Sequence, residues 1–209
     1  MRITALCNNV NPPMPLTGSD LKRLLDSSDL VVLLGGISLR GARSLKAYSI
    51  TGLFDDHYVA KVLDEATIFV ESKAQYLSNE WYLVGIGGRD PIANIRAIER
   101  ILSETPQGTH DDGKILIASY FCPYSLCDKS LLGGRRGLRE LLEFMEKYPV
   151  RAILSCECGP GVIEYKGVTT MCLGGGDCIG VLDIGEDDKI VGRVHCGDNR
   201  DGAFPGRNI

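Results

Sequence analysis

The sequence predicts an α/β protein, a four-layer α/β/β/α sandwich in which two mixed sheets pack face to face with helices outside. Three observations predict it. Strand and helix patterns alternate as far as Glu65, the apolar period changes to 2 from Thr67, and the pattern after Cys158 is entirely β. No repeat or linker divides the 209 residues, so we expect one domain over residues 1–196 and a tail over residues 197–209.

The N-terminal third alternates between short apolar runs and amphipathic segments. Three segments are expected to form strands: Ile3–Cys7, Asp29–Leu34 and Ser49–Leu53. Asp29–Leu34 is a near-continuous apolar run, which is typical of a parallel strand buried on both faces. The segments between and after them are expected to form helices: Leu16–Ser27, Ala42–Tyr48 and Asp56–Glu65. Asp55 and Asp56 lie at the start of the last helix, where a carboxylate caps free N–H groups.

The middle of the chain changes period twice. An antiparallel meander with Trp81 in the core is expected in three strands: Thr67–Glu71, Gln75–Ser78 and Trp81–Ile86. Pro91 then opens a helix whose apolar residues recur at helical spacing as far as Leu102.

The C-terminal half contains one more strand, helix and strand, followed by strands alone. We expect a strand at Lys114–Ser119, a connection over Tyr120–Gly134, a helix over Arg135–Tyr148 and a strand at Arg151–Ser155. Four further strands are separated by Gly-rich or Asp-rich turns: Val162–Tyr165, Val168–Cys172, Ile179–Ile184 and Ile190–Val194.

Composition excludes several classes of partner. The chain is 44% hydrophobic and 24% charged, with a net charge of −4 and scattered basic residues, so it lacks the basic footprint of a nucleic-acid binder or of a protein on an anionic membrane. Its apolar runs are far shorter than the roughly 20 residues of a membrane-spanning helix. Because the N-terminus leads directly into a strand pattern, without the apolar region of a signal peptide, we expect a cytoplasmic protein.

The order of these features resembles the calcineurin-like metallophosphoesterases over residues 1–196. The resemblance implies the sandwich fold of those enzymes, which hold two metal ions at the carboxyl ends of strands and hydrolyse phosphomonoesters or phosphodiesters. Such a site needs Asp, Asn and His side chains that converge from several loops. Members of the family often assemble as oligomers, so the resemblance also implies a homodimer, with an unknown protein partner as the alternative.

The positions that the resemblance implies for the metal ligands carry other residues. They are Asn8, Val10, Gly36, Leu53, Ser119, Cys156 and Cys158. Phe54 stands where the family has a catalytic His, and only Asp55, which supports that His in the family, matches the pattern. Gly36 lacks the carboxylate that would bridge both metals. We therefore expect a catalytically inactive protein, a pseudoenzyme without a cofactor and with a binding or structural role; residual phosphoesterase (hydrolase) activity is an alternative.

The eight cysteines support three further interpretations. Several fall on loops that this fold would bring to the former metal face: Cys7, Cys122, Cys156, Cys158 and, as a fifth candidate, Cys172. A thiolate site for zinc or an iron–sulfur cluster could draw on Cys7, Cys122, Cys127, Cys156 and Cys158. Their spacings are not those of a common zinc knuckle, which favours buried thiols or the local disulfides Cys122–Cys127 and Cys172–Cys178. A nucleophilic cysteine is the third interpretation. In the absence of a signal peptide, disulfides would be typical of a hyperthermophile.

Two other features have a structural and a functional interpretation. Arg135 and Arg136 stand at the start of a predicted helix, where the dipole disfavours cations, so we expect them to be solvated or beside a bound anion. The segments Gly85–Gly88 and Gly174–Asp177 are expected to be turns, because neither has the spacing of a phosphate-binding loop.

Overall fold

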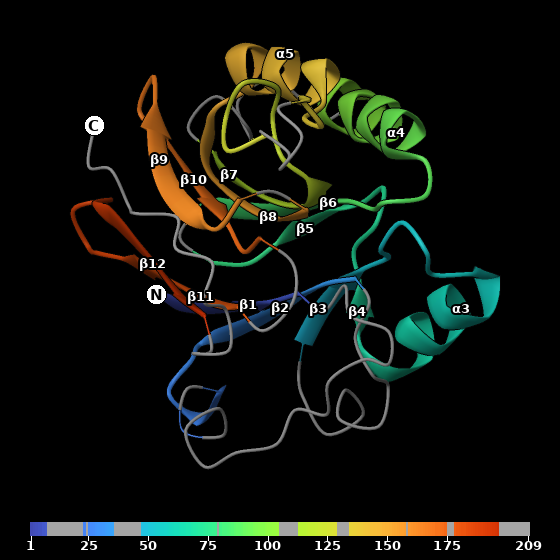
Figure 1. Cartoon of the computed structure of the whole chain (residues 1–209), viewed down its shortest axis with the longest axis horizontal. Helices are drawn as coiled ribbons and strands as arrows, with labels where there is room; N and C mark the ends of the chain where they lie inside the picture. Colours follow the sequence, from blue (N-terminus) through green and yellow to red (C-terminus); the bar gives the residue numbers. More distant parts are fainter. Residues whose placement is uncertain are drawn as a thin grey trace.

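Two six-stranded mixed sheets form the centre of the molecule (Figure 1). The structure, a computed structural model, describes residues 1–7, 23, 25–35, 47–78, 80–104, 113–128, 134–157, 159–174 and 178–196. Within these ranges the chain is α/β, as the sequence predicts. None of the helices in these ranges is long and apolar enough to cross a membrane.

The first sheet has the strand order β12-β11-β1-β2-β3-β4. Its strands are β1 (Arg2–Leu6), β2 (Leu30–Leu34), β3 (Ala47–Ile50), β4 (Ile68–Phe69), β11 (Cys178–Ile184) and β12 (Ile190–Cys196). Strands β1 to β4 run parallel, whereas β11 is antiparallel to both β1 and β12.

The second sheet has the order β5-β6-β7-β8-β10-β9. Its strands are β5 (Ala74–Tyr76), β6 (Trp81–Ile86), β7 (Lys114–Phe121), β8 (Val150–Glu157), β9 (Gly161–Tyr165) and β10 (Val168–Cys172). The four central strands β6, β7, β8 and β10 are parallel, and the two edge strands are antiparallel to their neighbours.

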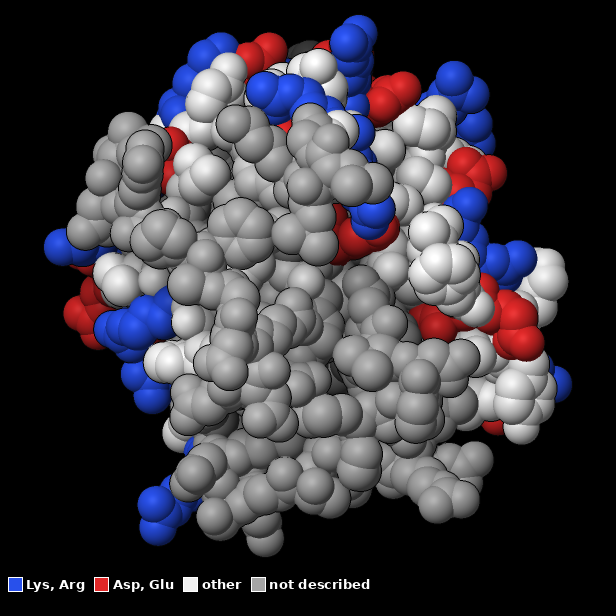
Figure 2. Space-filling model, in the orientation of Figure 1, with Lys and Arg blue, Asp and Glu red and all other residues white. Residues whose placement is uncertain are grey.

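Alternation along the strands divides the core into layers. Ile3, Val32, Leu116 and Leu154 point between the sheets and form one buried cluster. On the outer face of the second sheet, Ile117 and its neighbours pack beneath the helices α4 (Pro91–Glu104) and α5 (Arg139–Lys147) (Figure 1). The helix α3 (His57–Ala66) follows β3 and contacts β3 and β4. On the face shown in Figure 2, side chains of both charges are interspersed over the described surface.

The N-terminal caps agree with the predicted helix starts. Asp56 caps α3 by accepting a hydrogen bond from the backbone N–H of Val59 at 2.9 Å. Asp90 accepts one from the N–H of Ala93 at 3.0 Å, directly before the Pro91 that opens α4. Trp81 is buried, as expected.

Three sequence predictions about elements are wrong. Ala47 and Tyr48 belong to β3 and not to a helix, because they pair in parallel with Val31 and Val32. Strands β5 and β6 form the expected hairpin, but β4 leaves the meander and pairs with β3 in the other sheet. Helix α5 begins at Arg139, because the backbone of Leu138 still pairs with the segment after β7: its N–H donates to the Cys122 carbonyl at 2.9 Å.

Several predicted features lie outside the described residues. They are the tail over 197–209, most of the helix predicted at Leu16–Ser27, positions 42–46 and most of the Gly174–Asp177 turn. Of the predicted N-terminal helix, residues Arg23, Leu25 and Asp26 are described and are helical.

Candidate functional site

The carboxyl ends of the parallel strands of both sheets meet at one edge of the molecule. We call this the strand-end edge; it consists of Cys7, Gly35, Thr51 and Gly52 after the strands of the first sheet, and of Gly87, Gly88, Cys122, Cys156 and Glu157 at the ends of strands in the second. The backbone N–H of Gly88 donates to the Thr51 carbonyl at 2.9 Å, which joins the end of β6 to the end of β3. Ligand sites of open α/β sheets lie at such edges.

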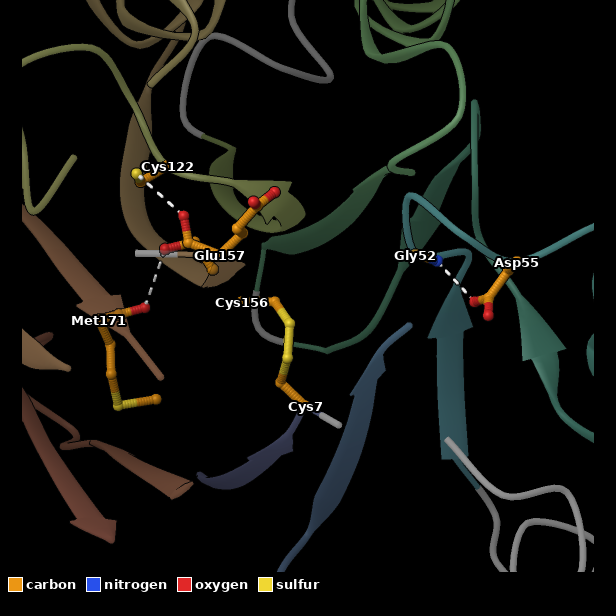
Figure 3. Close-up of a disulfide and its surroundings, with 8 residues drawn as sticks. Cys7, Gly52, Asp55, Cys122, Cys156, Glu157 and Met171 are labelled. Atoms are coloured by element: carbon orange, nitrogen blue, oxygen red, sulfur yellow. Dashed lines mark hydrogen bonds between the residues drawn. A yellow bond between two sulfur atoms is a disulfide. The ribbon is translucent and has the colours of Figure 1, made fainter. Parts of the chain in front are cut away.

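A disulfide between Cys7 and Cys156 connects the two sheets at the centre of this edge (Figure 3). Cys7 directly follows β1, and Cys156 is the next-to-last residue of β8. Both side chains are buried in the core between the sheets, and their Cα atoms are 5.5 Å apart. The bridge therefore takes the place where side chains from the two sheets would have to converge on a ligand.

Carboxylates at the same edge accept hydrogen bonds from the backbone. Glu71 Oε2 accepts from the Thr51 N–H at 3.0 Å and from the Thr51 hydroxyl at 2.5 Å. Asp55 Oδ2 accepts from the Gly52 N–H at 2.6 Å (Figure 3). The Glu71 carboxylate occupies the space of a Cβ at Gly87, so a side chain at that position would displace the carboxylate. Glu71 thus fixes the first residue after β3, and Asp55 fixes the turn that follows it.

We expect Glu71→Ala to lower the free energy of unfolding by about 2 kcal/mol, because it leaves a buried N–H and a buried hydroxyl without their charged acceptor. Urea denaturation measures this difference. The matched control is Glu65→Ala on the exposed side of α3, for which we expect a change within about 0.5 kcal/mol. Equal losses for the two variants would contradict this role of Glu71.

A second cluster lies on the outer face of the second sheet. Ser119, Ser155 and Cys172 stand in register across β7, β8 and β10. They point away from the core between the sheets, since the adjacent Tyr120, Cys156 and Met171 point into it. The Ser155 hydroxyl lies 3.2 Å from the Cys172 sulfur and 3.4 Å from the Met171 carbonyl oxygen.

Cys127 and Cys172 are free thiols with different environments. Complete burial, and then the contact with Cys127, raise the pKa of the Cys172 thiol well above its usual range. The hydrogen bond from Cys172 lowers the pKa of the Cys127 thiol, against the opposing effects of burial and of the nearby Asp128 carboxylate. Cys127 is therefore the member of the pair that ionises first.

Asp128 and Glu157 fix the segment that carries Cys127. Asp128 is 2% exposed and accepts from the Ser125 N–H at 2.8 Å and from Arg135 Nη1 at 2.9 Å. Arg136 Nη1 donates to Glu157 Oε1 at 2.9 Å. The sequence predicts Arg135 and Arg136 at the start of a helix, but both precede α5, which begins at Arg139. Each of the two arginines pairs with an acid of the protein.

Three buried side-chain atoms of the described residues have no hydrogen-bond partner: Ser119 Oγ, Thr170 Oγ1 and Glu157 Oε2. All three belong to strands of the second sheet. Alternation along β7, β8 and β10 places them on the face that carries Ser155 and Cys172. Polar side chains are therefore concentrated beneath the connection from β7 to α5.

The described members of the sequence-predicted site have different surroundings. Asn8, Val10, Gly36 and Cys158 lie outside the described residues. Leu53 is exposed after β3, and Ser119 is fully buried in β7. The predicted thiolate set is not assembled as such, because Cys7 and Cys156 are joined to each other and Cys122 is disulfide-bonded. Among the described residues, no three His, Cys, Asp or Glu side chains gather in a way that could hold a metal.

Both predicted local disulfides are wrong. Cys127 and Cys172 are free, and Cys178 pairs with Cys196 across β11 and β12, where the two residues stand in register. Sequence reasoning missed the Cys7–Cys156 bridge. The only sequence signal for the bridge is that each cysteine stands at the end of a predicted buried strand.

A depression of about 450 Å³ lies at the opposite end of the strands. It is lined in part by Met1, Trp81, Lys114 and Asp188. The Lys114 ammonium lies 2.7 Å from the Asp188 carboxylate. The lysine of this depression is thus paired with an acid of the protein, and we take the strand-end edge as the better candidate for a functional site.

Comparison with known proteins bears on the fold. No family model matches the chain, and no curated protein matches its sequence. One solved structure is 10% identical, with a TM-score of 0.66 over 93% of this chain and 98% of that chain. The crystal structure of TT1561 of Thermus thermophilus is 15% identical, with a TM-score of 0.54 over 92% of this chain and 97% of that chain. At these identities the likeness shows a shared fold, which extends over nearly the whole chain.

Proposed function

We propose that this protein is a non-catalytic relative of the calcineurin-like metallophosphoesterases, with their four-layer sandwich and a binding or structural role. The observation that carries the proposal is the Cys7–Cys156 disulfide. It connects the ends of β1 and β8, two of the strand ends from which the resemblance draws metal ligands. A disulfide sulfur is not a thiolate, and metal ligation by cysteine requires the thiolate.

The other groups at the strand-end edge support the same proposal. A two-metal hydrolytic site needs several carboxylate, amide and imidazole ligands whose lone pairs face the metals. Here Asp55 and Glu71 accept hydrogen bonds from the loop after β3. Leu53 has a hydrocarbon side chain, which cannot bind a metal ion. Ser119 has a single hydroxyl, and this hydroxyl lies on the outer face of the second sheet. This edge serves to hold the two sheets together.

The test is a phosphoesterase assay with added Mn²⁺, using an activated aryl phosphomonoester and an activated aryl phosphodiester. We expect no turnover above that of Mn²⁺ in buffer, and the same result for Asp55→Ala, whose folding is checked by its thermal transition. Mn²⁺-dependent hydrolysis by the natural protein that is lost in Asp55→Ala would overturn the proposal and favour the residual hydrolase.

The disulfides also bear on where the protein works. Disulfides persist in oxidising compartments and in the cytoplasm of hyperthermophiles. Of these two settings the hyperthermophilic cytoplasm agrees with the expected cytoplasmic location, and we propose it on that ground. We also propose a homodimer, on the ground of the family resemblance alone. A measurement of the molar mass in solution tests this proposal.

A further inference from the structure

Strand β9 is the last strand of the second sheet, and its outer edge is open. It pairs with β10 on one side, and no strand of the described residues pairs with it on the other (Figure 1). The backbone N–H and C=O groups along such an edge can pair with an additional strand. The edge of β9 is therefore a place where a further chain can bind.

The turn between β9 and β10 determines which backbone groups face outward. Lys166 and Gly167 have φ values of 50° and 78°, as in the two-residue type I′ turn of a hairpin. Tyr165 flanks this turn and exchanges both hydrogen bonds with its neighbour in β10, and the pattern then alternates along the strand. The N–H and C=O groups of Val162 and Glu164 consequently point away from β10.

The side chains of β9 leave apolar surface at this edge. Val162 is 40% exposed and Ile163 is 37% exposed, and both belong to the same short strand. Ile163 stands opposite Thr170 on the outer face of the sheet, together with Gly161 and Tyr165. The outer face of β9 thus carries no charge that would repel a second strand.

Contacts with α5 position the hairpin. The Lys166 ammonium lies 2.6 Å from Glu146 Oε1, and the Tyr165 hydroxyl donates to the same oxygen at 3.4 Å. The turn is therefore connected to the helix before any second chain binds. A positioned edge loses less conformational freedom on binding than a mobile one.

The other edge strands are less suited to pairing. Strand β4 has two residues and β5 has three, so both are shorter than β9. Strand β12 has seven, but Gly192 and the charged Arg193 stand at its middle. Glycine weakens a strand, and charged side chains protect natural edge strands from pairing. We therefore consider β9 the edge of choice.

We propose that a second copy of this chain binds at β9, so that the two β9 strands pair antiparallel about Ile163. In this register Val162 stands opposite Glu164 of the second copy, and their outward backbone groups meet. Ile163 stands opposite its own counterpart in a non-hydrogen-bonded pair, where side chains approach most closely. A shift by two residues toward the turn would place Glu164 opposite Glu164, and like charges directly opposite each other destabilise a sheet.

The occupant is a second copy because the edge is complementary to itself. Each copy presents the outward groups of Val162 and of Glu164, and the antiparallel register matches one with the other in both directions. Pairing of two five-residue strands should bury less than about 1,200 Å², the lower limit of standard interfaces, so we expect a dissociation constant above about 1 μM. The inference rests on the homodimer of the proposed function and names its interface, and it does not depend on whether the protein is catalytic.

Sedimentation equilibrium of the full chain between about 1 and 300 μM tests the dimer. We expect the average mass to rise with concentration from 22.7 kDa toward twice that value. Glu164→Pro removes an outward N–H and places a ring in the path of the second copy, whereas its pairing with β10 does not use this N–H. We expect it to weaken association at least tenfold.

The matched control is Val194→Pro on β12. The Gly185 N–H donates to the Lys189 carbonyl at 2.9 Å, and alternation from this pair places the Val194 N–H on the outer edge of β12. This variant should associate like the natural protein. Thermal transitions show whether both variants fold.

A cross-link tests the register without a proline. Ile163→Cys places two thiols opposite each other in the proposed dimer, so air oxidation should give a covalent dimer in which this position is linked to its own counterpart. The linked peptide is identified by its mass after digestion without reduction. Val191→Cys on β12 is the control, because Val191 is also 37% exposed, and it should give at least tenfold less of such a dimer.

The outcomes separate this inference from the proposals on which it builds. A natural protein that stays at 22.7 kDa up to about 300 μM would overturn the inference and the homodimer together, and would leave the edge to an extended segment of another protein. A dimer that Glu164→Pro leaves intact and that Ile163→Cys does not cross-link would overturn the β9 interface alone. The phosphoesterase assay decides on catalysis independently of both results.

Discussion

Removing the Cys7–Cys156 disulfide is expected to lower the free energy of unfolding by about 5 kcal/mol. The two cysteines are 149 residues apart, so the bridge closes most of the chain into a single loop. In the chain-entropy account, a longer loop restricts the unfolded state more and stabilises the folded state more. A loss of this size is comparable to the whole stability of many domains.

The measurement is urea unfolding of Cys7→Ala/Cys156→Ala without reductant. The matched control is Cys178→Ala/Cys196→Ala, whose bridge closes only 18 residues and for which the same relation gives a loss of about 3 kcal/mol. The order of the two losses is the decisive result. A smaller loss for the Cys7–Cys156 variant than for the control would show that the bridge does not hold the sheets together as we argue.

Elements that are defined by local pattern could be predicted from the sequence. Helix α4 has Pro91 at its first position and apolar residues at helical spacing, and the structure has it with its predicted start. Helix α3 has Asp56 as its cap, as expected. Strand β2 is an uninterrupted apolar run that is buried along its whole length. In each case the pattern that predicts the element lies within about 15 consecutive residues.

Elements that depend on distant partners could not be predicted in the same way. Strand β4 consists of Ile68 and Phe69 only, and its strand character comes from pairing with β3. Its own period does not say which sheet it joins. Ala47 and Tyr48 are likewise strand residues because β2 lies beside them.

The expected location of a site at the carboxyl ends of the strands stays a prediction, and the contacts at that edge could not be inferred from the sequence. The family resemblance points to the carboxyl ends of the strands, which is where Cys7, Cys156, Asp55 and Glu71 lie. The partner of each cysteine could not be inferred, because it depends on how the two sheets face each other. Cys7 follows β1 of the first sheet, and Cys156 belongs to β8 of the second.

Gly35→Ala is expected to lower the free energy of unfolding by about 3 kcal/mol. Gly35 directly follows β2 and has a φ of +83°, which a residue with a side chain adopts only with strain. A Cβ at this position would also overlap the backbone of Gly52, after the neighbouring strand β3. Backbone atoms cannot turn aside as a flexible side chain can, so the two strand ends would have to separate.

Gly167→Ala separates these two causes. Gly167 has a similar φ of +78° in the turn between β9 and β10, but a Cβ there would meet nothing within 4 Å. Gly167→Ala should therefore lower the free energy of unfolding only through backbone strain, by about 1 kcal/mol. Urea unfolding of the two variants gives the contribution of the close approach as the difference between them. If Gly35→Ala cost no more than Gly167→Ala, the ends of β2 and β3 would not be packed backbone to backbone, and the strand-end edge would have room for a ligand between the loops of the first sheet.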